Sequence, residues 1–287
     1  MDWLTNPIEW WINPFIDSEI MRDAVVAALL TVLGTSIVGS WVVLRGLTFL
    51  GDSLAQGVLP GIAVAWALSV DPQIGALVAA FAMVAGVNII RSSSPLPDDV
   101  SLGILCVGFL ALAVVLMSAR GGYGDLNRFL FGSITAVDDQ RIIRSAIFAG
   151  ITLVFAIVGY RALIMATFDS SQARIARFSP SVVHLALLVM TALTVVNSFE
   201  TVGSLLVFAF LIAPPTTASL LVKSVPRIIG LSIVLGALAA VVGLLISYHH
   251  RTAAGATMAL FSVMMFFLGL IATTSAFEQF LPSTASR

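Results

Sequence analysis

The chain is organised into long apolar stretches that are separated by short clusters of charged residues. Nine stretches contain no Asp, Glu, Lys or Arg: 24–44, 53–70, 73–90, 100–119, 145–160, 178–199, 201–222, 228–248 and 252–277. A helix needs about 20 apolar residues to cross the hydrocarbon core of a bilayer, whereas barrel strands are about half as long and alternate in polarity. The short stretch 145–160 counts as a span only if Arg144 or Arg161 extends its side chain to the interface. The pattern predicts an all-α, polytopic transmembrane helical bundle with eight or nine spans.

Three segments do not fit the spanning pattern. Residues 1–19 hold several tryptophans among charged residues, which is typical of a segment that lies in the headgroup region. Residues 119–140 are too polar to span and too apolar for a free loop, so we expect a short re-entrant or interfacial helix there. We therefore expect an N-terminal interfacial segment at 1–19, one transmembrane domain at 20–277 and a C-terminal tail at 278–287.

The composition supports a membrane protein and excludes several other classes. Hydrophobic residues make up 59% of the 287 residues and charged residues only 10%, whereas soluble domains carry about a quarter of charged residues. One cysteine excludes a disulfide scaffold, and a net charge of −1 gives no basic surface for a nucleic acid. We expect a multi-pass protein whose surroundings are the lipid bilayer.

Asp52 is the clearest polar exception inside an apolar run. An ionisable side chain inside a bilayer costs several kcal/mol by insertion scales, so it is a functional candidate by default. Gln56 follows one helical turn later on the same face. The two side chains offer a carboxylate and an amide oxygen, which suit a hard cation. The alternative is that Asp52 caps a helix that starts near Ser53, and the residues alone leave both readings open.

Prolines interrupt two of the apolar runs, at Pro60 and at Pro214-Pro215. Proline removes a backbone donor and frees a carbonyl, which membranes tolerate where helices line a cavity or a gate. Because transporters place binding sites at broken helices, we expect helix breaks with a gating role at these positions. A packed kink without a transport role is the alternative.

The remaining reactive residue types carry weaker signals. We expect His184 to be a hydrogen-bonded core residue and Cys106 to be a small core residue. No GxxxxGK[ST] motif is present, because the only lysine, Lys223, follows a valine. The chain therefore has no P-loop with which to hydrolyse ATP, and no protease signature such as HExxH or GxSxG.

Several motifs together resemble the bacterial metal-uptake ABC permeases, the manganese, zinc and iron permeases known as ABC-3. Leu44-Arg45 is followed by GDSLAQGVLPG at 51–61, where the family usually has Leu-Arg and then Gly-Asp-Ala-x-x-His-x-x-Leu-Pro-Gly. The stretches LFGSI at 130–134, VGSLLV at 202–207 and IAPPTTA at 212–218 also agree, in the same order. The similarity extends from about residue 20 to 275.

The resemblance implies a type II ABC importer permease. In that architecture two permease copies, identical or paired, surround a central path, two ATP-binding cassette subunits bind on the cytoplasmic side, and an extracytoplasmic metal-binding protein docks outside. It also implies a cytoplasmic coupling loop at 165–180, where Phe168, Asp169 and Ala173 match the family's Phe-Asp-x-x-x-Ala. Asp169 or Ser170 is suited to cap a short helix there.

Two positions depart from the family pattern. Gln56 replaces the usual histidine, and an oxygen pair made by Asp52 and Gln56 favours Mn²⁺ or Fe²⁺ over zinc. Arg177 replaces a glycine near the end of the coupling segment, so we expect a different helix end there. Arg174 and Arg177 give this segment a basic face toward the ATPase.

These expectations combine into one hypothesis. The chain is expected to be a non-enzymatic permease subunit in the bacterial plasma (inner) membrane, with Asp52 and Gln56 as metal ligands on the substrate path. ATP-Mg would be bound by the partner chain, and Mn, Zn or Fe would pass as substrate, manganese first. The alternatives are a permease for a non-metal or chelated substrate, and an ion-coupled carrier or channel.

Overall fold

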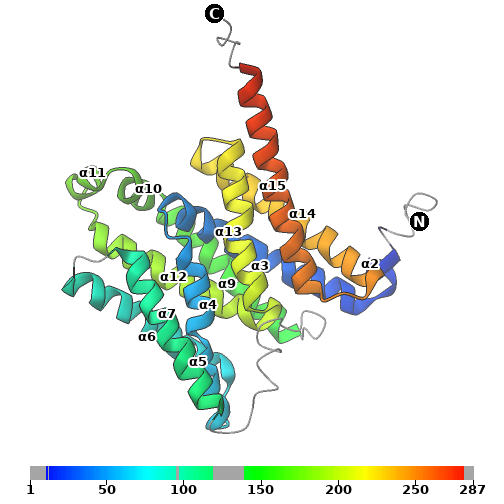
Figure 1. The fold of residues 1–287 in the computed structure, drawn as a ribbon, viewed down its shortest axis with the longest axis horizontal. Helices are drawn as coiled ribbons and strands as arrows, with labels where there is room; N and C mark the ends of the chain where they lie inside the picture. Colours follow the sequence, from blue (N-terminus) through cyan, green and yellow to red (C-terminus); the bar gives the residue numbers. More distant parts are fainter. Residues whose placement is uncertain (1–10, 12, 95–96, 119–138, 281–287) are drawn as a thin grey trace, which may run out of the picture.

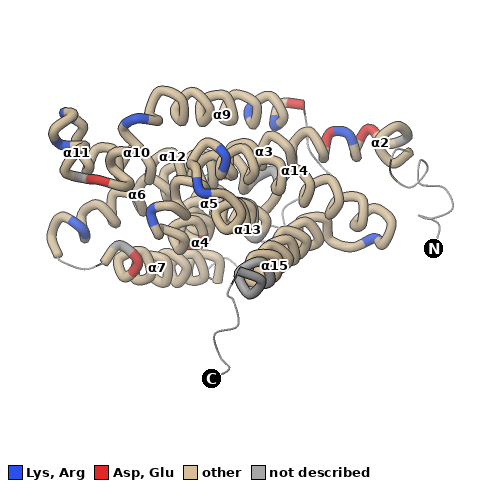
Figure 2. The backbone as a smooth tube through the Cα atoms, turned by 90° about the horizontal axis from the view of Figure 1, so that it is seen from above, with Lys and Arg blue, Asp and Glu red and all other residues tan. Residues whose placement is uncertain are grey.

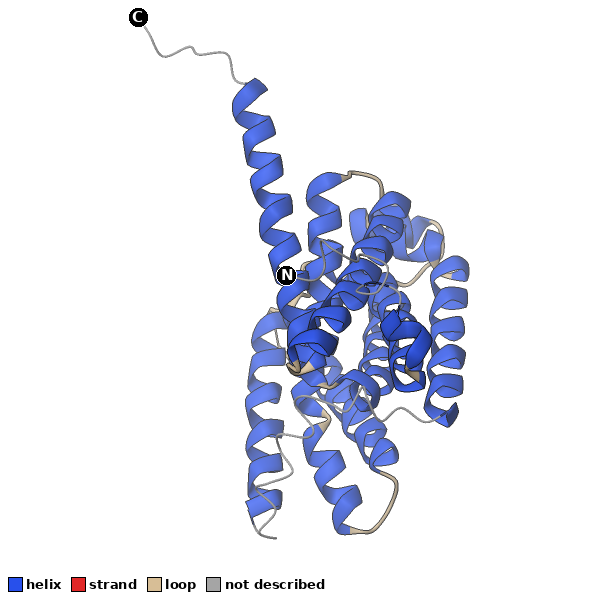
Figure 3. Ribbon diagram, turned by 90° about the vertical axis from the view of Figure 1, so that its right-hand side faces the viewer, coloured by secondary structure: helices blue, strands red, loops and turns tan. Residues whose placement is uncertain are grey.

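The computed structural model describes residues 11, 13–94, 97–118 and 139–280. Most of the expected interfacial segment 1–19, most of the expected helix at 119–140 and the tail residues 281–287 lie outside this part. Within it every regular element is a helix, and no strand is present (Figure 3). The all-α prediction is therefore confirmed.

The helices follow one another with short connections. In chain order they are α2 (Asn13–Asp17), α3 (Glu19–Leu44), α4 (Phe49–Gly57), α5 (Leu59–Ala67), α6 (Pro72–Ser93), α7 (Asp98–Ser118), α9 (Asp139–Val158), α10 (Tyr160–Phe168), α11 (Ser170–Ile175), α12 (Pro180–Val202), α13 (Ser204–Leu221), α14 (Val225–His250) and α15 (Ala254–Phe280). Each of the nine predicted apolar stretches corresponds to one long helix or, at 53–70, to most of the α4–α5 pair.

Seven of the described helices are long and apolar enough to cross a membrane: α3, α6, α7, α9, α12, α14 and α15. The other two predicted spans take different forms. The stretch 53–70 is divided between α4 and α5. Over 206–221, α13 counts as a shorter apolar helix and not as one of the seven candidate spans. Charged residues lie mostly toward the ends of the long helices, and the tube in Figure 2 is tan along most of its length.

The break between α4 and α5 falls at Val58, just before Pro60. Pro60 occupies the first turn of α5, where its missing N–H and fixed φ do no harm. The break that we predicted at Pro60 is therefore present. At Pro214 and Pro215 the prediction is wrong, because α13 continues through both prolines.

The packing around Pro215 explains why α13 does not break. Proline at this position leaves the Leu211 carbonyl without its helical donor. Gly39 of α3 faces that carbonyl so closely that a Cβ on Gly39 would overlap with it. The α3 backbone thus covers the freed carbonyl and keeps it away from lipid. Both prolines are buried, so they are packed inside the bundle, and their gating role stays a prediction.

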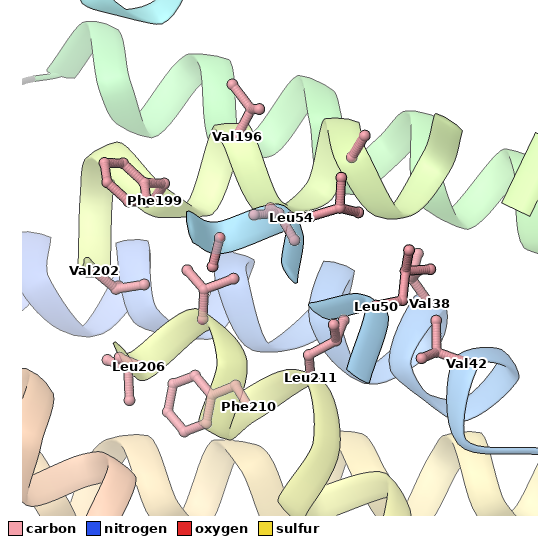
Figure 4. Close-up of a cluster of buried hydrophobic side chains, with 14 of the residues drawn as sticks. Val38, Val42, Leu50, Leu54, Val196, Phe199, Val202, Leu206, Phe210 and Leu211 are labelled. Atoms are coloured by element: carbon pink, nitrogen blue, oxygen red, sulfur yellow. The ribbon is translucent and has the colours of Figure 1, made fainter. Parts of the chain in front are cut away.

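The core surrounds α4, which packs against α6, α7, α12 and α13. Figure 4 shows this cluster, in which Leu50 and Leu54 of α4 meet side chains of the neighbouring helices. The cluster also contains Val38 and Val42 of α3, Val196, Phe199 and Val202 of α12, and Leu206, Phe210 and Leu211 of α13. Leu50 and Leu54 are each 1% exposed. One face of this short helix is therefore fixed inside the bundle.

Small residues bring helices into direct backbone contact. A Cβ on Gly61 of α5 would overlap with the Gly75 carbonyl of α6, and a Cβ on Gly75 would overlap with the Gly61 carbonyl. Gly243 of α14 lies in the same way on Met258 of α15. Close approach at small residues is expected where lipid supplies no hydrophobic drive for helix association.

The two ends of the bundle differ. In Figure 1, α10 and α11 lie toward the top with the C-terminal end of α15, whereas α5 lies at the bottom. Arg144, in the first turns of α9, donates a hydrogen bond to Gln73 at the start of α6. The charged first turns of α9 thus lie against the start of α6. Residues 145–158 of the predicted stretch 145–160 form the apolar part of this 20-residue helix, which ends at Val158.

Candidate functional site

α4 has two distinct faces. Leu50 and Leu54 are buried in the core, whereas Asp52 and Gln56 are half-buried. Residues four apart share a helix face, and a shift of two residues turns a side chain by about 200°. The polar pair therefore lies opposite the buried leucines and faces the open side of the helix.

The structure brings Asp52 and Gln56 into direct contact. Gln56 Nε2 donates to Oδ1 and to Oδ2 of Asp52, both at 3.0 Å. α4 begins at Phe49, so Asp52 lies inside the helix and does not cap a helix that starts at Ser53. The helix-cap alternative is excluded.

The Gln56 amide is not oriented as the sequence suggested. We expected its oxygen and the Asp52 carboxylate to face the same point, where a cation would bind. A carboxylate only accepts hydrogen bonds, so the Gln56 nitrogen must face it. The Gln56 oxygen faces α7, where the Cys106 thiol donates to Oε1 at a sulfur–oxygen distance of 3.6 Å. For a carboxylate oxygen of Asp52 and Oε1 of Gln56 to bind the same cation, the Gln56 amide must rotate about its terminal bond.

Cys106 is the polar neighbour that sequence reasoning missed. We expected a small core residue, and its burial, at 5% exposed, agrees with that. Its contact with Gln56 joins helices that are 50 residues apart in sequence, and no local pattern signals such a contact.

The site is suited to transient binding of a cation rather than to permanent retention. The described residues hold no group of three or more His, Cys, Asp or Glu side chains in an arrangement that would bind a metal ion. Asp52 provides the charge, and the Gln56 amide provides one more oxygen after rotation. A transported ion must be released again, so a small ligand set is compatible with a path.

The half-exposed carboxylate also restricts what lies beside α4. A charged side chain that faces hydrocarbon costs several kcal/mol, so such residues face the bundle interior or a water-filled cavity. Asp52 is only partly covered by the described residues of its own chain. This face of α4 must therefore border water or another protein surface.

A second candidate region follows α10, at the end of the bundle opposite α5. Asp169 is the N-cap of α11, and its Oδ1 accepts hydrogen bonds from the backbone N–H groups of Ser171, at 2.9 Å, and Gln172, at 3.0 Å. The predicted capped helix is thus confirmed. Ala173 is fully buried, whereas Phe168 is 63% exposed. α11 thus packs against the bundle through Ala173, and the apolar side chain of Phe168 before it is exposed.

Arg177 ends α11 in the conformation that glycine normally adopts. Its φ is +62°, the Phe178 N–H donates to the Ala173 carbonyl, and the Arg177 N–H donates to the Arg174 carbonyl. These two bonds define a Schellman ending. The different helix end that we expected is not seen, because arginine accepts the left-handed conformation at a cost of roughly 1–2 kcal/mol.

A hollow lies at the junction of α11 and α12. Its volume is about 530 Å³. It is lined by Arg174, Arg177, Phe178, Ser179, Pro180 and Ser181. The two arginines and the apolar rings make it a basic recess at an end of the bundle.

Arg45 connects this region to the helices that carry the polar pair. It follows α3, four residues before α4 begins, and its Nε donates to Thr167 Oγ1 at 3.0 Å near the end of α10. Burial, together with the positive charge of nearby Arg91, lowers the pKa of the Arg45 guanidinium. The sequence motif included Arg45, but only the structure shows what it contacts.

The fold and the site define the class of protein. A bundle of membrane-spanning helices with an acid on a broken helix, and a short capped helix between two spans, is typical of a multi-pass transport protein. Comparison with known proteins agrees with this class. The ABC 3 transport family matches residues 17–273, and the chain belongs to this family.

Individual relatives cover nearly the whole chain. The manganese import system permease protein ScaB of Streptococcus parasanguinis is 34% identical over 264 residues, which are 90% of this chain and 93% of that protein. The manganese transport system membrane protein MntC of Listeria monocytogenes is 30% identical over 261 residues, 91% and 93% of the two chains. A solved structure of PsaBC from Streptococcus pneumoniae, in complex with Fab, matches with a TM-score of 0.80 and 30% identity, covering 90% and 94%. The structure is thus that of a membrane permease of an ABC transporter.

Proposed function

We propose that this chain is the permease subunit of an ABC importer that moves divalent metal ions across the bacterial plasma (inner) membrane, manganese first and zinc or iron next. The observation that carries the proposal is the Asp52–Gln56 pair on the open face of α4. It is the point where a charge is kept inside an apolar bundle although no salt bridge within the described residues accounts for it.

Manganese is favoured by the chemistry of the pair. Carboxylate and amide oxygens suit Mn²⁺, whereas an imidazole at the Gln56 position would favour zinc and similar borderline metals. Relatives of this chain are named as manganese transport proteins, which supports the same choice.

The uncovered side of Asp52 supports a paired arrangement. A second permease copy, identical or homologous, would close this side and turn the polar face of α4 into the wall of a central path. An extracytoplasmic metal-binding protein would deliver the ion at the end of the bundle where α5 lies. This arrangement supplies the water or protein contact that the carboxylate requires.

The segment 165–180 is the proposed contact with the ATP-binding cassette subunit on the cytoplasmic side. Phe168 offers an apolar side chain, and Arg174 and Arg177 offer positive charge beside the recess between α11 and α12. ATP-Mg is bound and hydrolysed in that partner chain. Movement of α11 would reach the path helices through Arg45 and through the core contacts of α12 with α4.

Reconstitution tests this function directly. The chain is incorporated into proteoliposomes with its partner ATPase and the extracytoplasmic metal-binding protein. Uptake of Mn²⁺, Zn²⁺ and Fe²⁺ is then compared with and without ATP. We expect ATP-dependent uptake with manganese preferred, and co-purification of a P-loop ATPase. Uptake that does not need ATP would indicate an ion-coupled carrier, and ATP-dependent uptake of only a chelate or non-metal ligand would indicate a different substrate.

A further inference from the structure

Cys106 extends the polar pair toward α7. It is the only cysteine in the 287 residues, and it is nearly fully buried where α7 packs against α4. Its thiol contacts Gln56 Oε1, and it lies close enough to Asp52 to feel the charge of that carboxylate. Carboxylate, amide and thiol thus form one chain of polar groups between two helices.

A second buried polar group lies at the same point. Ser53 is fully buried, and its hydroxyl has no hydrogen-bond partner of good geometry among the described residues. Its side chain lies beside the Cys106 thiol. A buried polar group without a partner costs roughly 1–3 kcal/mol. The contact between α4 and α7 therefore holds a buried hydroxyl oxygen that can coordinate a cation beside the thiol.

We propose that Cys106 and Asp52 form a binding point for thiophilic divalent cations, and that Cys106 determines how strongly such cations are held on the path. This inference rests on the proposed function, since it adds a sulfur ligand to the proposed metal path. Sulfur selects softer metals such as Zn²⁺ and Cd²⁺, whereas Mn²⁺ prefers oxygen. Manganese would pass along the oxygen side, zinc would pass more slowly, and a strongly thiophilic ion such as Cd²⁺ would be retained.

The binding step is a simple exchange. As the metal binds, the thiol loses its proton to water and the sulfur coordinates as thiolate, with no change in oxidation state. The hydrogen bond from the thiol to Gln56 Oε1 breaks in this step. The Gln56 amide, released from the thiol, is then free to turn its oxygen toward the metal.

Cadmium is a suitable probe because a Cd²⁺–thiolate pair absorbs in the ultraviolet. The transporter, in lipid nanodiscs with its ATPase, is titrated with Cd²⁺, and the spectrum of Cys106→Ser is subtracted so that Cys106 alone is observed. We expect a thiolate band in the wild type, and in Asp52→Asn at least about tenfold more Cd²⁺ for half of the signal. Asp71→Asn, an exposed helix cap that asparagine also satisfies, should behave as the wild type. Absence of the band, or identical titrations for wild type and Asp52→Asn, would overturn the inference.

Transport provides an independent measurement. Cd²⁺ should inhibit Mn²⁺ uptake by the wild type, and Cys106→Ser should need at least about tenfold more Cd²⁺ for the same fractional inhibition of its own Mn²⁺ uptake. If the two proteins transport Mn²⁺ and are inhibited equally, the inference fails and the proposed function stands. If the wild type transports no Mn²⁺, the proposed function fails, and the absorption titration still decides whether Cys106 and Asp52 bind the metal.

Discussion

At the scale of single residues, the Gln56 amide occupies the position where a cation would meet Asp52. Its Nε2 donates to both carboxylate oxygens at 3.0 Å, so the acid is satisfied by a neutral group of its own helix. The amide must turn its nitrogen away from the carboxylate before Asp52 and Gln56 bind one cation together. The affinity for the cation therefore depends on the ligand that residue 56 provides as well as on the Asp52 carboxylate.

Replacing Gln56 with histidine tests this dependence. An imidazole at the same place is a better ligand for zinc than an amide oxygen. We expect Gln56→His to raise the ratio of Zn²⁺ to Mn²⁺ uptake by about tenfold, which corresponds to about 1.4 kcal/mol. Competition between the two ions in proteoliposomes measures the ratio. Gln140→His, at an exposed position on α9, is the matched control, and an unchanged ranking in Gln56→His would exclude Gln56 as a ligand.

The residue scale also shows what a sequence can and cannot reveal. Asp52 and Gln56 were predictable because residues four apart in a helix share a face and an acid in an apolar run is conspicuous. The contact of Cys106 with Gln56 was not, because it depends on how α7 packs against α4. The direction of the amide was also hidden, since it follows from the hydrogen bonds that the two neighbours impose.

At the scale of elements, α5 and α6 are held together by direct backbone contact at Gly61 and Gly75. A methyl group on Gly61 would meet a carbonyl that has no room to move, and overpacking of this kind costs about 1–3 kcal/mol. We expect Gly61→Ala to lower the thermal unfolding temperature of the purified protein. Gly150→Ala has open space around it and should leave the temperature unchanged or raise it slightly. Equal effects of both substitutions would contradict the close contact.

The capped helix α11 gives a prediction about coupling. Asp169→Ala removes both hydrogen bonds of the N-cap, which costs about 1 kcal/mol of helix stability. We expect less metal transported per ATP hydrolysed, because α11 no longer transmits movement as a rigid unit. Asparagine caps as well as aspartate, so Asp169→Asn should transport normally. If Asp169→Ala kept the wild-type ratio of transport to hydrolysis, α11 would not be the coupling element.

Helix ends and breaks were only partly predictable. The cap at Asp169 and the new helix at Pro60 follow from local rules that hold without tertiary contacts. Pro214 and Pro215 do not break α13, because α3 covers the Leu211 carbonyl at Gly39. Arg177 keeps a glycine-like ending because the two Schellman hydrogen bonds fix the backbone. Local sequence propensity does not predict a helix end or break where a neighbouring helix or a full set of hydrogen bonds determines it.

At the scale of the whole molecule, the nine apolar stretches predicted the bundle because membrane helices must satisfy their backbone internally. Seven of them form single long helices, and α4–α5 and α13 depart from that form. These two exceptions pack against each other through α4 and α13. The irregular part of the bundle is thus also the part that carries Asp52.

The central claim is that the Asp52 carboxylate binds the cation on its path through this bundle. The most direct measurement is the initial rate of ATP-driven Mn²⁺ uptake by Asp52→Asn in proteoliposomes that contain the ATPase and the binding protein. We expect the rate to fall at least about tenfold while assembly and ATP hydrolysis are retained, and we expect Asp71→Asn to transport as the wild type does. Uptake by Asp52→Asn at the wild-type rate would contradict the account.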